Sequence, residues 1–92
     1  MRETTKEEAL NRLRSVSGHL NAVVRMVERE AYCVDIIKQI LAVQGALNKV
    51  SSIILESHLQ TCVTTAIRGE NPAERERVIG ELMEIFEMSR RI

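Results

Sequence analysis

Residues 32–68 read YCVDIIKQILAVQGALNKVSSIILESHLQTCVTTAIR, a run with one glycine and no proline. So few helix breakers predict one central helix from about Tyr32 to Arg68, with Gly69 as its stop. At 1.5 Å per residue, such a helix is roughly 55 Å long. Its apolar band is too wide for one partner, so one side should pack on another helix of the chain and another side on a second copy. The band consists of Ile36, Ile37, Ile40, Leu41, Val43, Leu47, Val50, Ile53, Ile54, Leu59 and Val63.

A shorter helix is predicted on each side of this run. The first spans about residues 5–29, is capped by Thr4 or Thr5, and carries apolar residues at spacings of three, four or seven that form one stripe. The stripe consists of Leu10, Leu13, Leu20, Val24 and Val27. The last helix spans about residues 73–88 and follows a proline, which suits a helix start. We therefore expect an all-α fold, a three-helix protomer with one long central helix, in which residues 1–92 form a single domain.

The composition is that of a small globular protein of 92 residues, 45% hydrophobic, with a formal net charge of +0. The sequence contains no run of about 18 apolar residues, so no transmembrane helix is predicted. The polar N-terminus lacks the apolar stretch of a signal peptide. The protein is therefore expected in the cytoplasm, where thiols stay reduced. Its two cysteines then indicate metal binding or redox chemistry rather than a structural disulfide. No credible set of nucleophile, base and orienting group is present, so an enzyme is not expected.

His58 and Cys62 are the centre of the predicted chemistry, because residues four apart stand on the same face of a helix, one turn apart. An imidazole and a thiolate in that arrangement can hold one metal ion, but two ligands rarely suffice. The other cysteine, Cys33, precedes His58 by 25 residues. That interval is roughly 37 Å of straight helix, so Cys33 cannot complete the site of its own chain unless the helix bends back.

A second, antiparallel copy of the chain would complete the site. Midway between the ligands lie the small residues Ala42, Gly45 and Ala46. If two copies cross there about a two-fold axis, each Cys33 meets His58 and Cys62 of the other copy, which gives two identical sites. Two thiolates and one imidazole form a soft set of low coordination number that favours Cu(I). Zinc, which usually takes four ligands or three and a water, is the less natural alternative.

Three stretches resemble the CsoR/RcnR family of metal-sensing repressors: RLRSVSGHLNAVVRMVE, AYCVDIIKQILAVQGAL and ESHLQTCVTTAI, which cover most of residues 9–67. The run GELMEIF is similar to the third helix of the family, and the intervals of 25 and 4 between Cys33, His58 and Cys62 resemble those of the copper-sensing members. The resemblance implies an antiparallel helical dimer that assembles into a dimer-of-dimers tetramer. It also implies that the metal-free tetramer binds operator DNA and that Cu(I) releases it, so that copper-resistance genes are derepressed.

The same resemblance implies a role for two residues beside the ligands. Tyr32 and Glu81 look like the pair that couples the metal to quaternary structure in the family, through a hydrogen bond made by His58.

Basic residues for DNA binding are also expected. The segment from Ala9 to Val27 holds three arginines and no acidic residue. Arg12 and Lys49 resemble basic positions of the family, although Ser52 stands where a further arginine is often found. As a patch, these side chains could neutralise phosphates, and several protomers would multiply the effect. The patch consists of Arg12, Arg14, Arg25 and Lys49.

Other branches of the family differ at identifiable residues. Nickel and cobalt sensors have a histidine where this chain has Cys62, and formaldehyde sensors have a proline where it has Arg2. Persulfide sensors keep both cysteines but lack the histidine, so a repressor that senses reactive sulfur through Cys33 and Cys62 is the nearest alternative. From a different class, a copper-buffering helical oligomer without DNA binding also stays open, and the zero net charge favours it.

Overall fold

The computed structural model describes residues 1–90, which are mostly helical and contain no strand. Along the chain follow the helices α1 (Glu3–Glu28) and α2 (Cys33–His58), the π-helical segment η1 (Leu59–Val63), and the helices α3 (Thr64–Arg68) and α4 (Pro72–Arg90). Since α2, η1 and α3 follow one another without a break, the predicted central helix and its end before Gly69 are confirmed. The chain divides into two compact units, Met1–Ser57 and a second unit that begins at His58.

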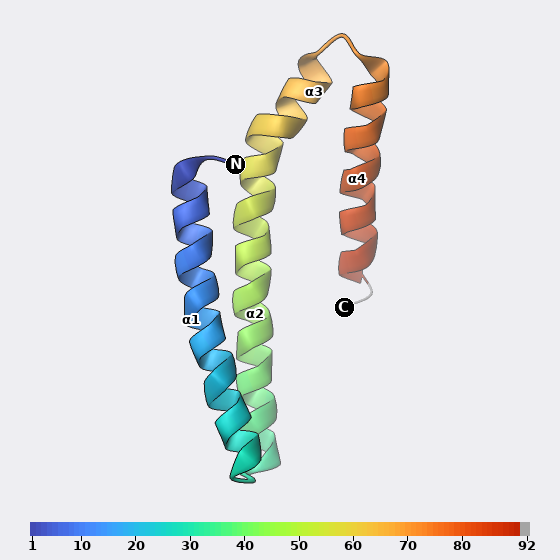
Figure 1. Cartoon of the computed structure of the whole chain (residues 1–92). Helices are drawn as coiled ribbons and strands as arrows, with labels where there is room; N and C mark the ends of the chain where they lie inside the picture. The colour runs from blue at the N-terminus through green and yellow to red at the C-terminus, as the bar shows by residue number, and fades with distance from the viewer. Residues whose placement is uncertain (91–92) are drawn as a thin grey trace. The chain divides into compact units, whose positions relative to one another are not determined.

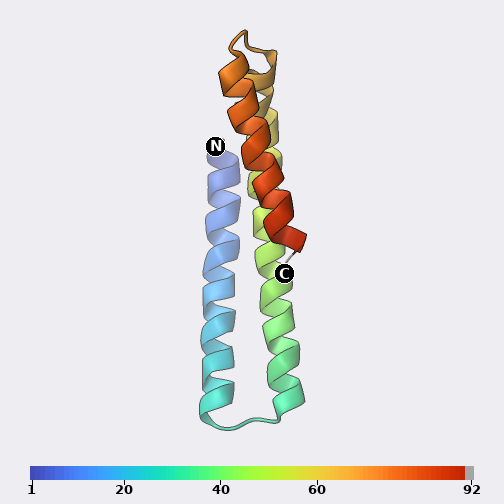
Figure 2. The ribbon, with the colours of Figure 1, turned by 90° about the vertical axis from the view of Figure 1, so that its right-hand side faces the viewer.

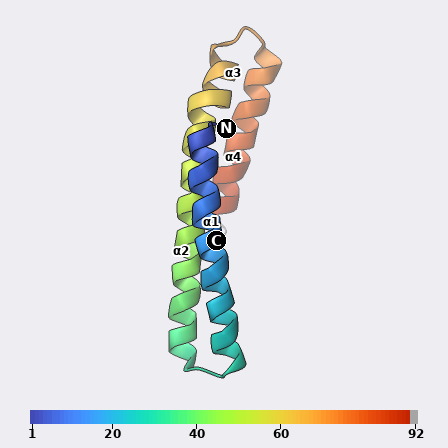
Figure 3. The same cartoon turned by 60° about the vertical axis from the view of Figure 1, so that its left-hand side comes forward.

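In the first unit, α1 and α2 lie side by side and run in opposite directions (Figure 1), and Figure 3 shows the same hairpin from another side. Their core is a small cluster of Val16, Val23 and Val43, with Ile36 and Ala46 packed against it. Buried positions recur every seven residues, at 9, 16 and 23 in α1 and at 43, 50 and 57 in α2. This heptad spacing is typical of a helix pair that meets along one narrow seam.

The stripe predicted for α1 is not the one that is buried within the chain. Leu20, Val24 and Val27 are 49%, 50% and 55% exposed, whereas Ala9 and Val23 are each only 4% exposed. Both sets of residues have helical spacing, and α2 packs on the set with the smaller side chains. The larger apolar side chains of α1 therefore face outward from the first unit.

The beginning of α1 also differs from the prediction. The helix starts at Glu3, with Arg2 in the N-cap position and no side-chain cap. The predicted cap by Thr4 or Thr5 is therefore wrong, because both residues already lie inside the first helical turn.

The turn between α1 and α2, visible in Figure 2, satisfies the last carbonyls of α1. The N–H of Glu30 donates to the carbonyl of Val27 at 3.0 Å, and the N–H of Ala31 donates to that of Met26 at 2.9 Å, which is the pattern of a Schellman motif. Glu30 has a φ of 53°, a left-handed conformation that glycine usually occupies. The chain then enters α2 directly after Tyr32.

In the second unit, α4 packs on the end of the central helix. The buried residues Val63, Ala66 and Val78 form its core, and Leu82 packs against them. No helix in residues 1–90 is both long and apolar enough to cross a membrane.

The start of α4 is fixed by its own sequence. The side-chain oxygen of Asn71 accepts hydrogen bonds from the N–H groups of Ala73 at 3.1 Å and Glu74 at 3.3 Å. Asn71 is therefore the N-cap residue, and Pro72 takes the first helical position, where its missing N–H costs nothing. The predicted third helix is confirmed, with bounds within two residues of those expected.

Candidate metal centre

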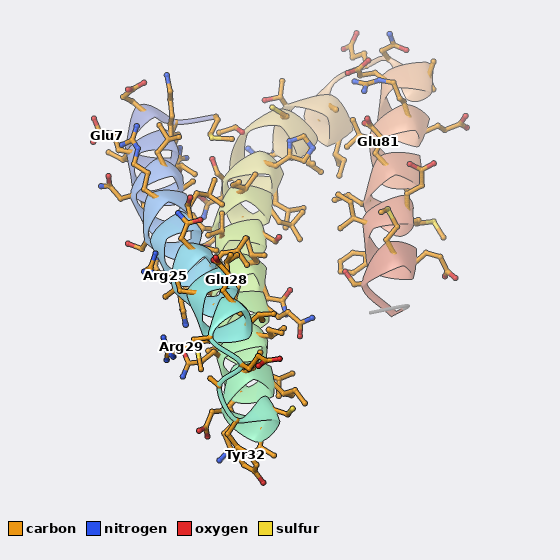
Figure 4. All side chains as sticks on the ribbon, turned by 60° about the horizontal axis from the view of Figure 1, so that its bottom comes forward. Glu7, Arg25, Glu28, Arg29, Tyr32 and Glu81 are labelled. Atoms are coloured by element: carbon orange, nitrogen blue, oxygen red, sulfur yellow. The ribbon has the colours of Figure 1, made fainter. Side chains whose placement is uncertain are left out.

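Cys33 lies in the first unit as the first residue of α2, and its thiol is free and exposed. The carbonyl of Tyr32 accepts the N–H groups of Asp35 and Ile36, at 3.0 and 3.1 Å, so Tyr32 sits at the entrance of the helix. Its side chain is 70% exposed, and Figure 4 shows it at the end of the hairpin. Both side chains are thus open to a partner.

His58 and Cys62 lie in the second unit, at the junction of α2 and η1. His58 is half-buried, whereas Cys62 is exposed and lies inside the π-helical segment. The hydroxyl of Thr61 donates to the sulfur of Cys62 at 3.7 Å. This contact helps to fix the position of the sulfur.

The π-helical backbone around Cys62 was not predicted. The N–H of Thr64 donates to the carbonyl of Leu59, five residues earlier, and also to that of Thr61. The hydroxyl of Thr64 donates to the carbonyl of Leu59 at 2.5 Å. Single π-helical turns inside α-helices are rare and occur frequently at functional sites. The backbone between His58 and Cys62 therefore includes part of a π-helical turn, which is wider than the α-helical turn that was predicted.

Glu81 is exposed on α4, where Arg77 holds it. Arg77 donates from one terminal nitrogen to Glu81 at 2.9 Å and from the other to Glu74 at 2.5 Å. The hydrogen bond to Glu74, and then the charges of Glu74 and Glu81, raise the pKa of Arg77. Figure 4 shows Glu81 on α4. Arg77 was not among the predicted site residues, although its spacings of three and four from two glutamates favour such ion pairs.

A shallow groove in the second unit connects the Cys62 thiol to this ion-pair network. Its wall runs from η1 across the turn to the start of α4. It is lined by Thr61, Cys62, Thr65, Ala66, Gly69, Glu70, Asn71, Glu74 and Arg77. Cys62 thus opens onto a groove whose lining also includes side chains of both charge signs.

The predicted ligands are distributed over both units, Cys33 in the first and His58 with Cys62 in the second. Among residues 1–90, no three side chains of His, Cys, Asp or Glu gather in one chain as a group that could hold a metal ion. The donor types nevertheless suit a soft metal ion, since both thiols are free and exposed.

The predicted basic residues Arg12, Arg14, Arg25 and Lys49 are all exposed in the first unit. Arg12 donates to Glu8 at 3.2 Å, and the pair lines an open groove along α1. This partner lowers the positive charge that Arg12 presents to an approaching phosphate.

Two features of this hairpin were missed in the sequence. Figure 4 shows Arg29 on the same side of α1 as Arg25, four residues earlier, so the basic surface extends to the end of the helix. His19 and Gln39 hydrogen-bond through Nε2 and Oε1 at 2.7 Å. This contact ties α1 to α2 beside the groove.

Comparison with protein families gives a match over residues 5–88 to the family described as metal-sensitive transcriptional repressor. The copper-sensing transcriptional repressor CsoR of Mycobacterium tuberculosis is 53% identical over 62 residues, which are 67% of this chain and 52% of that protein. The chain thus spans about half the length of the first curated relatives it matches. The CsoR of Bacillus subtilis (strain 168) is 40% identical over 81 residues, 88% of this chain and 77% of that protein.

Two solved structures share the fold. The copper-sensing repressor CsoR with Cu(I) from Geobacillus thermodenitrificans superposes with a TM-score of 0.83 and 35% identity, over 96% of this chain and 88% of that one. A variant of the formaldehyde-responsive regulator FrmR from Salmonella enterica serovar Typhimurium gives a TM-score of 0.77 and 30% identity, over 95% and 96% of the two chains.

Proposed function

The chain belongs to the metal-sensitive transcriptional repressor family, and from that premise we propose that it is a Cu(I)-responsive repressor. The family resemblance found in the sequence is confirmed, and the family consists of regulators rather than enzymes. In our proposal the metal-free protein binds operator DNA, and Cu(I) releases it, which derepresses copper-resistance genes. The observation that carries the proposal is the donor set of Cys33, His58 and Cys62, with both thiols free and exposed.

The proposed site combines Cys33 of one chain with His58 and Cys62 of a second copy. In the first unit, α2 is helical from Cys33 to Ser57, which corresponds to roughly 36 Å of helix. Cys33 therefore stands at one end of α2, and His58 follows Ser57 at the other. An antiparallel second copy brings opposite ends of two such helices together.

The surface of α2 supports pairing with a second copy. Ile37 and Leu41 are 55% and 60% exposed, although a soluble helix normally buries such side chains. A side chain added at Gly45 would meet nothing within 4 Å, so the middle of α2 is open to close approach. We propose that residues 1–92 act as one domain that forms an antiparallel dimer and then a dimer-of-dimers tetramer.

The chemistry that Cu(I) supplies is strong bonding to two thiolates and one imidazole at low coordination number. The chain contributes the orientation of these donors. Thr61 donates to the sulfur of Cys62. Tyr32 and Glu81 are proposed to couple the occupied site to the assembly through His58, which requires Glu81 to engage a group other than Arg77.

The proposed DNA surface consists of Arg12, Arg14, Arg25 and Lys49, all exposed in the first unit. Four copies in one tetramer would present this set repeatedly to the phosphate backbone, and phosphate contacts make the affinity salt-dependent. Because a transcriptional repressor binds DNA, we also propose that the protein is located in the cytoplasm.

A DNA-binding titration tests the proposal. The reduced protein is titrated onto operator DNA from upstream of its own gene, alone and with stoichiometric Cu(I), Ni(II) or a persulfide donor. We expect binding that is lost with Cu(I) and kept with the other two. Loss with the persulfide donor alone would instead establish a sulfur-sensing repressor, and Cu(I) binding without any DNA binding would favour the copper-buffering alternative.

A further inference from the structure

The π-helical turn of η1 determines how Cys62 follows His58 around the helix axis. In an α-helix each N–H donates to the carbonyl four residues earlier, whereas here the N–H of Thr64 donates to the carbonyl of Leu59, five residues earlier. Each residue of an α-helix turns about 100° around the axis. One additional residue in a turn therefore changes the angular relation between the side chains before the turn and those within or after it.

Thr64 holds this turn with both of its donors. Its N–H is shared between the carbonyls of Leu59 and Thr61, and its hydroxyl donates to the carbonyl of Leu59 at 2.5 Å. The next threonine behaves in the ordinary way, because the hydroxyl of Thr65 donates to the carbonyl of Thr61, four residues earlier. Of the two neighbouring threonines, only Thr64 therefore spans the π-helical turn with its hydroxyl.

The core of the second unit fixes the residues next to Thr64. Val63 and Ala66 are 3% and 7% exposed and pack with Val78 of α4. The backbone after the turn is thus anchored in the core, and the hydroxyl of Thr64 joins that anchored part to the carbonyl of Leu59 on the far side of Cys62. Conversion of the turn to α-helix would break this bond and change the angle between Cys62 and His58.

We propose that Thr64 is a positioning residue for the metal ligands, whose hydroxyl maintains the π-helical turn that sets His58 and Cys62 for Cu(I). This inference rests on the proposed function only in taking Cu(I) as the ion bound there. Thr64 does not touch the metal. It acts through the backbone that carries Cys62, whereas Thr61 acts on the sulfur itself.

Three variants separate this role from a general effect on helix stability. Thr64→Val removes the hydroxyl and keeps a β-branched side chain, Thr65→Val makes the same exchange one residue later, and Thr64→Ser restores a hydroxyl. Cu(I) affinity is measured by anaerobic competition with a chromophoric Cu(I) chelator, together with the thiolate-to-copper absorption band. We expect Thr64→Val to bind Cu(I) about tenfold more weakly, with an altered band. Thr65→Val and Thr64→Ser should match the wild-type protein.

Amide hydrogen exchange on the metal-free protein gives a second readout of the same contact. The amide of residue 64 should exchange faster in Thr64→Val than in Thr65→Val. If Thr64→Val does not fold, Thr64→Ala removes the same hydroxyl and introduces a residue that favours helix. Wild-type Cu(I) affinity in a folded Thr64 variant that lacks the hydroxyl, or equal losses in both valine variants, would overturn the inference. A wild-type protein that does not bind Cu(I) would instead refute the proposed function itself.

Discussion

Cys62 has more local support than a lone exposed thiol on a helix surface. The hydroxyl of Thr61 donates to its sulfur, and Thr64 closes the turn around it. Cys33 has a simpler setting at the open start of α2. Of the two proposed thiolate ligands, one is therefore held by its surroundings and the other is presented to a partner.

Replacement of Cys62 by serine should abolish tight Cu(I) binding, because a hydroxyl is a hard and poor ligand for this ion. The affinity for operator DNA should stay at the wild-type level, since Cys62 lies outside the proposed basic surface. Fluorescence anisotropy of labelled DNA, with and without Cu(I), measures both. A variant that is still released by Cu(I) at wild-type concentrations would remove Cys62 from the ligand set. Ser52→Ala, which alters only a hydroxyl that donates to its own helix, is the control.

Residue types predicted the candidate ligands but not their surroundings. Cys33, His58 and Cys62 were identified because His58 and Cys62 are four residues apart and Cys33 is the other cysteine of the sequence. The ion pairs of Arg77 depend on which rotamers two exposed glutamates adopt, and composition does not report this. The hydrogen bond between His19 and Gln39 likewise depends on the register of two helices.

At the scale of elements, helix ends were predictable where a residue type has a strong positional preference. The Asn71 cap and Pro72 begin α4 within one residue of the expected position. The buried stripe of α1 was not predictable, because Ala9, Val16 and Val23 have the same kind of spacing as the larger leucines and valines. Because π-helical turns are rare, the pattern of residues 59–63 predicted a regular helix.

Replacement of Glu30 by glycine should stabilise the first unit. Glu30 has a φ of 53° in the turn that ends α1, and a side chain in this conformation carries a steric cost that glycine lacks. We expect the free energy of unfolding to rise by about 1 kcal/mol, measured by urea denaturation followed by circular dichroism. Glu28→Gly, two residues earlier in the helical part of α1, is the matched control and should lower it. Destabilisation by both variants would show that this conformation is not strained in solution.

At the scale of the whole molecule, the outward apolar faces of the hairpin require an explanation beyond one chain. Leu20, Val24 and Val27 of α1 and Ile37 and Leu41 of α2 are each about half exposed or more. Apolar surface of this extent is typical of an interface between subunits. The proposed assembly covers these faces and also completes the metal site.

A site shared between two copies can be tested by mixing variants. Neither Cys33→Ser nor Cys62→Ser alone can form a complete site. In a mixed dimer, Cys33 from the second variant meets His58 and Cys62 from the first, which restores one site. Anaerobic Cu(I) titration should therefore show recovery of tight binding when the two variants are unfolded and refolded together. The control is each variant treated alone, and no recovery in the mixture would contradict a site in which Cys33 of one copy joins His58 and Cys62 of the other.

The seam between α1 and α2 buries valine and alanine, and no large side chain among residues 1–90 is fully buried. Because the two helices bury only small side chains between them, the protomer alone has low stability. Its folding is therefore coupled by mass action to its association. A freshly synthesised chain would then remain open to proteases until it meets another copy. The cellular pool of this regulator would have a concentration threshold below which chains are degraded rather than stored. A thermal midpoint that did not rise with protein concentration would contradict that coupling.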